Sequence, residues 1–268
     1  MTMVVLAAAI AAAAVAQPPA PQSSPAMFVV RDADTTVYIF GTFHALDGKS
    51  DWFRDRVRIA FENSGELILE TVIPEGPVAF GPVRGQPLSV TPSASFLATT
   101  RMAIDAGKSQ GMQVGNGADN VLRHVAEAQG KPAEGLETLE LQMSMFSRMP
   151  ATGAPPPRAG EPVEGADPKA GMSRVMADMQ SAWKRGDQSV FVRILDQLEK
   201  GSPQTYRMMF TERNARWADW IAGRMQTPGT VFVAVGAGHL AGTKSVQDYL
   251  QKLGIAAQRV PHHETPVK

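Results

Sequence analysis

Two histidines each stand three residues after a glycine, at the end of a strand-like run. They are His44, which ends Gly41–His44, and His239, which ends Gly236–His239, while Glu70 ends a third strand-like run. Imidazoles and a carboxylate are ligands for Mn, Co or Zn, and such an ion lowers the pKa of a bound water. Without a metal, the same trio could act as general base, general acid and orienting carboxylate. Either chemistry predicts a hydrolytic site.

The residues around His44 predict the order strand, corner, helix, strand. β-branched and aromatic residues predict a hairpin over 29–31 and 36–40. After the Gly-x-x-His corner, Ser50 or Asp51 is expected to cap a helix, and the apolar run 66–70 predicts a short buried strand. We expect the glycine of the corner to let the chain turn sharply out of its strand.

The C-terminal end repeats this order. A strand is predicted over 230–235, an amphipathic helix over 245–253 and a last strand over 255–260. Ligands of α/β sheets gather beyond the carboxyl ends of strands, so we expect the two histidines and Glu70 to lie together.

The middle of the chain is predicted to be mostly helical. Apolar residues recur at helical spacing over 120–129, 136–149, 172–183, 189–200 and 204–225. Two stretches near 74–95 and 150–171 are rich in Pro and Gly and predict flexible loops. The predicted fold is α/β: a central mixed sheet built from two strand–GxxH–helix–strand units, with the helical middle segment packed on it. We expect one domain over 27–268.

The composition excludes several classes of site. The 268 residues include no cysteine, which excludes disulfides, thiolate catalysis and cysteine-ligated metals. The formal net charge is zero, so we expect no nucleic-acid partner.

The N-terminal residues predict export. Residues 1–16 are apolar and end in the small residues Ala14-Val15-Ala16, which is typical of a cleaved signal peptide, and a Pro-rich linker follows over 17–26. No later run is apolar and long enough to cross a membrane. The sequence therefore predicts a periplasmic or secreted protein with no stable membrane span after cleavage.

Two other motifs are weaker. Gly107–Gly111 fits the GxSxG string of serine hydrolases, but no buried strand is predicted before it. The glycines of Gly236–Gly242 resemble a dinucleotide-binding turn, but the chain ends before a second half that would hold a dinucleotide.

Five segments together resemble the TraB/GumN family, which is related to the Tiki metalloproteases and more distantly to erythromycin-esterase and ChaN-like proteins. They are GTFHAL, ELILE, GKPAEGLETLELQ, RNARWADWI and FVAVGAGHLAG, in that order. The resemblance covers nearly the whole mature chain. It implies a shared α/β core and, from the Tiki branch, a peptidase activity supported by Mn or Co.

The resemblance also implies roles for individual residues. The family's GxxH histidines correspond to His44 and His239, and its strand-terminal acid to Glu70. Its Gly-Leu-Glu segment ends at Glu137, and its Arg-Asn pair corresponds to Arg213 and Asn214. Two of these roles have equally good alternatives. Glu137 could instead cap a helix. Arg213 could either clamp a substrate carboxylate or oxyanion, or pair with an acid in the core.

The leading hypothesis is an exported metal-dependent hydrolase that cleaves a peptide or ester bond. In this hypothesis His44, Glu70 and His239 hold the metal, and Glu70, Glu137, Arg213 and Asn214 serve catalysis. The expected partner is a peptide or small-molecule substrate. Two alternatives remain, a non-catalytic periplasmic binding or regulatory protein of the same fold and a metal carrier.

Overall fold

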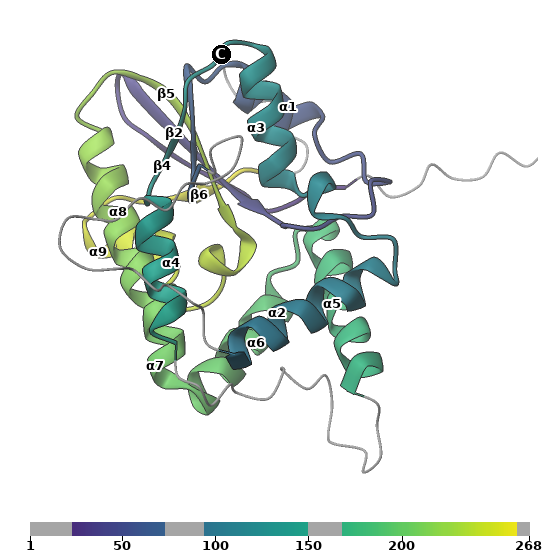
Figure 1. Ribbon diagram of the computed structural model, residues 1–268. Coiled ribbons are helices and arrows are strands. Elements are labelled where there is room, and N and C mark those ends of the chain that lie inside the picture. The colour runs from purple at the N-terminus through teal and green to yellow at the C-terminus, as the bar shows by residue number, and fades with distance from the viewer. Residues whose placement is uncertain (1–22, 73–93, 150–167, 262–268) are drawn as a thin grey trace, which may run out of the picture.

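The chain folds around a six-stranded sheet, seen edge-on at the centre of Figure 1. The computed structural model describes residues 23–72, 94–149 and 168–261. The strand order is β4-β3-β5-β2-β1-β6. The four parallel strands are β4 (Ala133–Gly135), β3 (Glu66–Leu69), β5 (Gly229–Gly236) and β2 (Thr35–Thr42). The two others are β1 (Met27–Arg31), antiparallel to both of its neighbours, and β6 (Gln258–Arg259).

Helices cover both faces of the sheet, because alternate side chains of each buried strand point to opposite faces. Tyr38 and Phe40 of β2 join one hydrophobic core and Val37 and Ile39 join the other. The first core includes residues of α1 (Asp55–Glu62), α3 (Ala118–Ala128), α5 (Pro168–Arg185), α6 (Ser189–Gly201) and α7 (Pro203–Tyr206). The second core lies under α8 (Glu212–Arg224) and α9 (Val246–Lys252) (Figure 1). The prediction of an α/β fold with a mixed sheet is confirmed.

The remaining elements connect these layers. They are α2 (Ala94–Lys108), α4 (Leu139–Ser147), a π-helical segment (Arg207–Thr211) and the 3₁₀ turns Val114–Asn116 and Ala237–Leu240.

The two strands that carry the Gly-x-x-His corners are neighbours. β2 pairs with β5 in parallel along its whole length, and the predicted hairpin joins β1 to β2. β3 pairs with the other side of β5, so β5 of the second strand–GxxH–helix–strand unit lies between β2 and β3 of the first unit.

Several local predictions were wrong. Neither Ser50 nor Asp51 caps α1, because this helix begins only at Asp55 and its N-cap, Arg54, makes no side-chain capping bond. The short edge strand β4 was not predicted. The single helix predicted over 204–225 is instead interrupted by the π-helical segment.

Some predictions lie outside the described residues. They concern the signal peptide (1–16), most of the linker (17–26) and most of the two loops; α2 begins at Ala94 and α5 at Pro168, inside the predicted loop ends. Within the described residues, no helix is both long and apolar enough to span a bilayer.

Candidate functional site

The ends of three adjacent parallel strands bring the predicted ligands together. His44 follows β2, Glu70 follows β3, and His239 lies in the 3₁₀ turn after β5. A Cβ atom placed on Gly236 would lie 3.1 Å from Glu70 Oε1, 3.5 Å from His44 Nε2 and 3.6 Å from His239 Cδ2. The three side chains therefore surround one point at the carboxyl edge of the sheet, where α/β proteins bind ligands.

The glycines of the corners provide space, not an unusual backbone. Neither Gly41 nor Gly236 has a positive φ, which differs from the predicted role in a sharp turn. A Cβ on Gly41 would lie 3.3 Å from Ala237 Cα, so the absence of a side chain lets the two corners pack closely. On Gly236, a side chain would fill the point where the three candidate ligands meet.

His239 is fixed in the core. Its ring is packed between Phe210 of the π-helical segment and Trp217 of α8, with centroid distances of 4.8 and 4.5 Å. Nδ1 donates to Asn214 Oδ1 at 2.6 Å, and the Asn214 amide is oriented by its bond to the Lys244 carbonyl. Nε2 is therefore the unprotonated nitrogen, 3.7 Å from Glu70 Oε1. Burial, aided by the charge of Arg213, lowers the pKa of His239 to about 3, so the ring is neutral at pH 7.

Glu70 is held as a carboxylate. The Gly236 N–H donates to Oε1 at 2.6 Å and Arg213 donates to Oε2 at 2.8 Å. Burial opposes ionisation, but the neighbouring positive charges and the Gly236 bond outweigh it and lower the pKa of Glu70 to about 2. Glu70 is therefore ionised throughout the neutral range.

Arg213 joins this carboxylate to a second one. Its side chain is 2% exposed, lies over the Trp217 ring and donates to both Glu70 and Glu137. Glu137, equally buried, also accepts from Arg216. The alternative that Glu137 caps a helix is wrong, because Thr138 is the N-cap of α4. For Arg213, pairing with acids in the core is the role that the structure supports.

His44 has a very different environment. Its side chain is 62% exposed, and its Nδ1 lies 3.2 Å from Asp119 Oδ1. Desolvation opposes protonation, but the bond to Asp119 and the charges of Asp119 and Glu70 outweigh it and raise the pKa of His44 to about 9. The imidazole is therefore protonated at neutral pH when no ligand is bound.

Asp119 was missed by the sequence predictions. It lies in the first turn of α3, and the start of that helix packs on the first corner: the Ala118 N–H donates to the Phe43 carbonyl at 2.9 Å. Gly117 makes this approach possible, because a Cβ there would lie 2.3 Å from the His44 carbonyl oxygen. An acidic residue in a first helical turn is common, so this signal alone could not identify Asp119.

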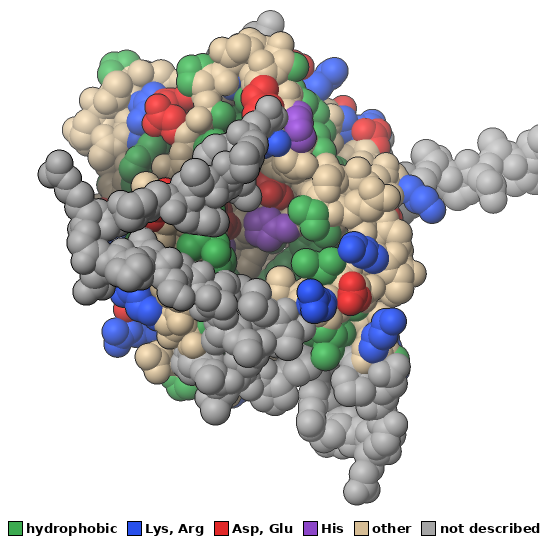
Figure 2. All heavy atoms as spheres, viewed as in Figure 1, with side chains coloured by type: hydrophobic (Ala, Val, Ile, Leu, Met, Phe, Trp, Pro, Cys, Tyr) green, Lys and Arg blue, Asp and Glu red, His purple; other side chains and the backbone are tan. Residues whose placement is uncertain are grey.

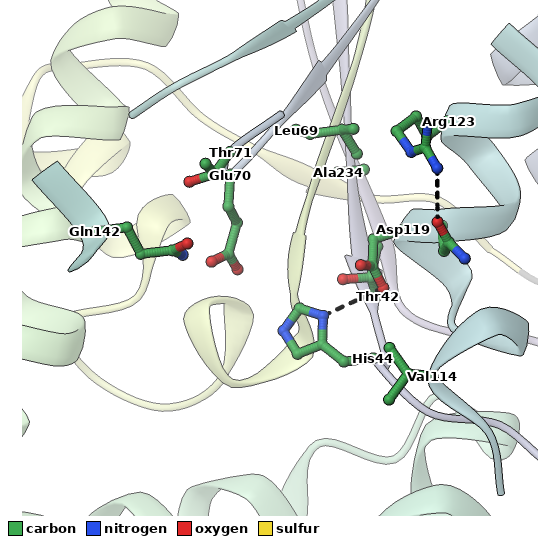
Figure 3. Close-up of a pocket in the computed structure, with 11 residues that line it drawn as sticks. Thr42, His44, Leu69, Glu70, Thr71, Val114, Asp119, Arg123, Gln142 and Ala234 are labelled. Atoms are coloured by element: carbon green, nitrogen blue, oxygen red, sulfur yellow. Dashed lines mark hydrogen bonds and ion pairs between the residues drawn. The ribbon is translucent and has the colours of Figure 1, made fainter. Parts of the chain in front are cut away.

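A cavity of about 470 Å³ opens beside these residues. Figure 2 shows histidine and acidic side chains at the bottom of a hollow on this face. In Figure 3, Glu70, Thr71 and Gln142 form one side of the cavity, and His44, Asp119 and Val114 form the other. The arrangement can therefore present a carboxylate and an imidazole to the same bound molecule.

The donors near the cavity do not form a closed metal shell. Within the described ranges, no three His, Asp or Glu side chains are grouped closely enough to hold an ion. The ligand set His44, Glu70 and His239 thus stays a prediction.

The GxSxG string has no catalytic geometry. Gly107 and Lys108 end α2, and the Ser109 hydroxyl donates to the Ala106 carbonyl. This serine follows a helix rather than a strand, unlike the nucleophile of a serine hydrolase.

Comparison with known proteins gives one result. The model of a protein family described as the TraB/PrgY/gumN family matches residues 26–80 and 83–259. No curated protein and no solved structure matches the chain significantly.

Proposed function

The chain belongs to the TraB/PrgY/gumN family, and on this premise we propose that it is an exported, divalent-metal-dependent hydrolase of peptide or ester bonds. One observation carries the proposal: His44, Glu70 and His239 surround the same point beside Gly236, at the edge of a 470 Å³ cavity. We propose that residues 1–16 direct export and that the mature chain begins at Gln17. N-terminal sequencing of the exported protein tests this part.

The chemical types of the donors favour a divalent ion, although within the described residues the three side chains would have to move closer together to hold one. Each imidazole has its Nδ1 beside an oxygen: His239 Nδ1 is hydrogen-bonded to Asn214, and His44 Nδ1 forms an ion pair with Asp119 at 3.2 Å. Such outer oxygens orient metal-binding histidines and leave Nε2 for the ion. Two neutral imidazoles and one carboxylate suit Mn, Co or Zn. The opposing feature is Arg213, whose Nη1 lies 3.4 Å from His239 Nε2, so an ion would have to compete with this guanidinium.

In this proposal His44, Glu70 and His239 would hold the ion, which when bound supplies a water of lowered pKa and polarises the carbonyl under attack. The ionised Glu70 carboxylate, which faces both imidazoles, would also orient the attacking water by accepting a hydrogen bond from it. Arg213, Glu137 and Asn214 contribute by position: they are almost fully buried and hold Glu70 and His239 in place.

A metal-dependent activity assay tests the proposal. Tag-free protein is freed of metal, then assayed for cleavage of a peptide pool and of ester substrates with Mn²⁺, Co²⁺ or Zn²⁺. We expect cleavage that needs an added ion and falls at least about 100-fold in Glu70→Gln. The matched control is Glu199→Gln, an exposed acid on α6 that pairs with Lys244. Wild-type protein that is folded, yet cleaves nothing with any of the ions, contradicts the proposal.

A non-catalytic binding protein is the second candidate. It is favoured by the ion pair with Arg213, which already neutralises Glu70 and opposes a cation beside His239. This candidate predicts saturable ligand binding without a product detectable by mass spectrometry.

A further inference from the structure

Two hydroxyl groups of the cavity wall are buried without a hydrogen bond to any described residue. Thr42, at the end of β2, is 2% exposed, and Thr71 follows Glu70 directly. Within the described part of the chain, neither Oγ1 atom has a hydrogen-bond partner. A buried hydroxyl without a hydrogen bond costs about 1–3 kcal/mol, so proteins rarely leave one unpaired. Both residues line the cavity, and a small movement of their side chains would let the two hydroxyls bind a molecule that enters it.

Gln142 adds an amide to the same cavity. It lies on α4, and in Figure 3 its side chain points towards Glu70 and Thr71, across the cavity from His44. Among the described residues, its carboxamide forms no side-chain hydrogen bond. The helix is held firmly where it begins, because Glu137, directly before the N-cap, binds Arg213 and its N–H donates to the Glu70 carbonyl.

The charged groups at the cavity are already paired. Glu70 is bound by Arg213 and Asp119 by His44. Arg123, on the wall, is bound to Glu127 and to Asn120. A ligand's carboxylate or ammonium group would thus have to break one of these pairs in order to bind. The neutral hydroxyls and the carboxamide need no such exchange.

We infer that Thr42, Thr71 and Gln142 form a subsite for an uncharged segment of peptide backbone, so that the enzyme cleaves inside a peptide rather than at a charged end. The inference rests on the proposed function and names its substrate class. The Gln142 carboxamide donates to a backbone carbonyl and accepts from a backbone N–H, and each threonine hydroxyl can do either. Leu69, Val114 and Ala234 line the same cavity and leave apolar space for a substrate side chain.

The test compares blocked and free peptides on the full mature chain. A pool of peptides with acetylated N-termini and amidated C-termini is assayed against the same pool with free ends, and binding is measured in parallel by fluorescence anisotropy. The variants are Gln142→Ala, Thr71→Val and Thr42→Val, with Thr71→Ser and Thr42→Ser as partners that keep the hydroxyl. Gln251→Ala, an exposed glutamine on α9, is the matched control.

We expect the peptides with blocked ends to be cleaved no more slowly than the peptides with free ends. Loss of one neutral hydrogen bond should raise KM about 2- to 10-fold and should lower kcat by a smaller factor. The serine variants, which keep the hydroxyl, should restore the wild-type KM. Cleavage that requires a free end, or Val variants that behave like wild type, overturns the subsite and leaves the hydrolase standing. Without any cleavage, binding of blocked peptides that Gln142→Ala weakens supports the subsite alone. The absence of any binding overturns it.

Discussion

The two Gly-x-x-His corners have similar sequences but opposite environments. His239 is buried between two aromatic rings, bonded to Asn214 and neutral. His44 is mostly exposed, forms an ion pair with Asp119, and is protonated. A repeated motif thus places two imidazoles at one point, while the elements packed around them decide the charge of each. The imidazole of the second corner is held in one orientation and is neutral, whereas that of the first corner is exposed and must lose a proton before it can bind a metal.

The largest expected difference concerns the ion-pair network behind the second corner. Arg213→Leu should lower the free energy of unfolding by about 3–5 kcal/mol, because it leaves Glu70 and Glu137 buried without their cation. Urea denaturation followed by tryptophan fluorescence measures it. The control is Arg216→Ala, whose half-exposed side chain also binds Glu137 and should cost below about 1 kcal/mol. If both variants lowered the free energy of unfolding equally, the buried ion pairs of Arg213 would not be what stabilises the second corner.

Removal of each imidazole compares the corners directly. His239→Ala should destabilise the protein by about 2–4 kcal/mol, since it empties a packed site and leaves Asn214 Oδ1 unpaired. His44→Ala should lower the free energy of unfolding by less than about 1 kcal/mol, because it removes only a solvent-exposed ion pair with Asp119. Thermal and urea unfolding of both variants without metal provide the measurement, and similar losses would contradict the contrast.

In acid the second corner should lose stability. The pKa of His239 is lowered from 6.5 to about 3 on folding, so the unfolded chain binds a proton that the folded chain does not. Its stabilising effect is complete above about pH 6.5 and declines as the pH falls towards 3, by at most about 1.4 kcal/mol per pH unit. In His239→Gln, the urea midpoint should fall less between pH 6.5 and pH 5 than in the wild type. The same pH dependence in both proteins would argue against a buried neutral ring.

The first corner should show a smaller effect of the opposite sign. The pKa of His44 is raised from 6.5 to about 9, so its stabilising pair with Asp119 is complete below pH 6.5 and declines as the pH rises towards 9. Exposure to solvent weakens this pair. Titration of the His44 ring by NMR in wild type and Asp119→Asn measures it. We expect the pKa of His44 in the variant to lie well below the wild-type value. Equal values would show that Asp119 does not raise the pKa of His44.

Local patterns predicted the strands of the site, and long-range packing determined the rest. The β-branched runs before both corners predicted β2 and β5, and the acid that ends the ELILE run predicted Glu70. Asp119 could not be predicted, because its contact with His44 depends on how α3 packs against the first corner. Gln142 ends the segment GKPAEGLETLELQ, but nothing in that segment indicated that its side chain faces the cavity, and β4 is only three residues long. The opposite charges of the two histidines likewise arise from residues distant in sequence.

The most direct test of the central claim is a metal titration. Tag-free mature protein is titrated with Mn²⁺ and Co²⁺ by calorimetry at pH 6, 7 and 8, alongside His44→Ala and His239→Ala. We predict one ion per chain, an affinity that rises about tenfold per pH unit as His44 loses its proton, and loss of binding in both variants. Wild-type protein that binds no ion, or variants that bind as tightly as wild type, would contradict the claim that the two corners form one metal site.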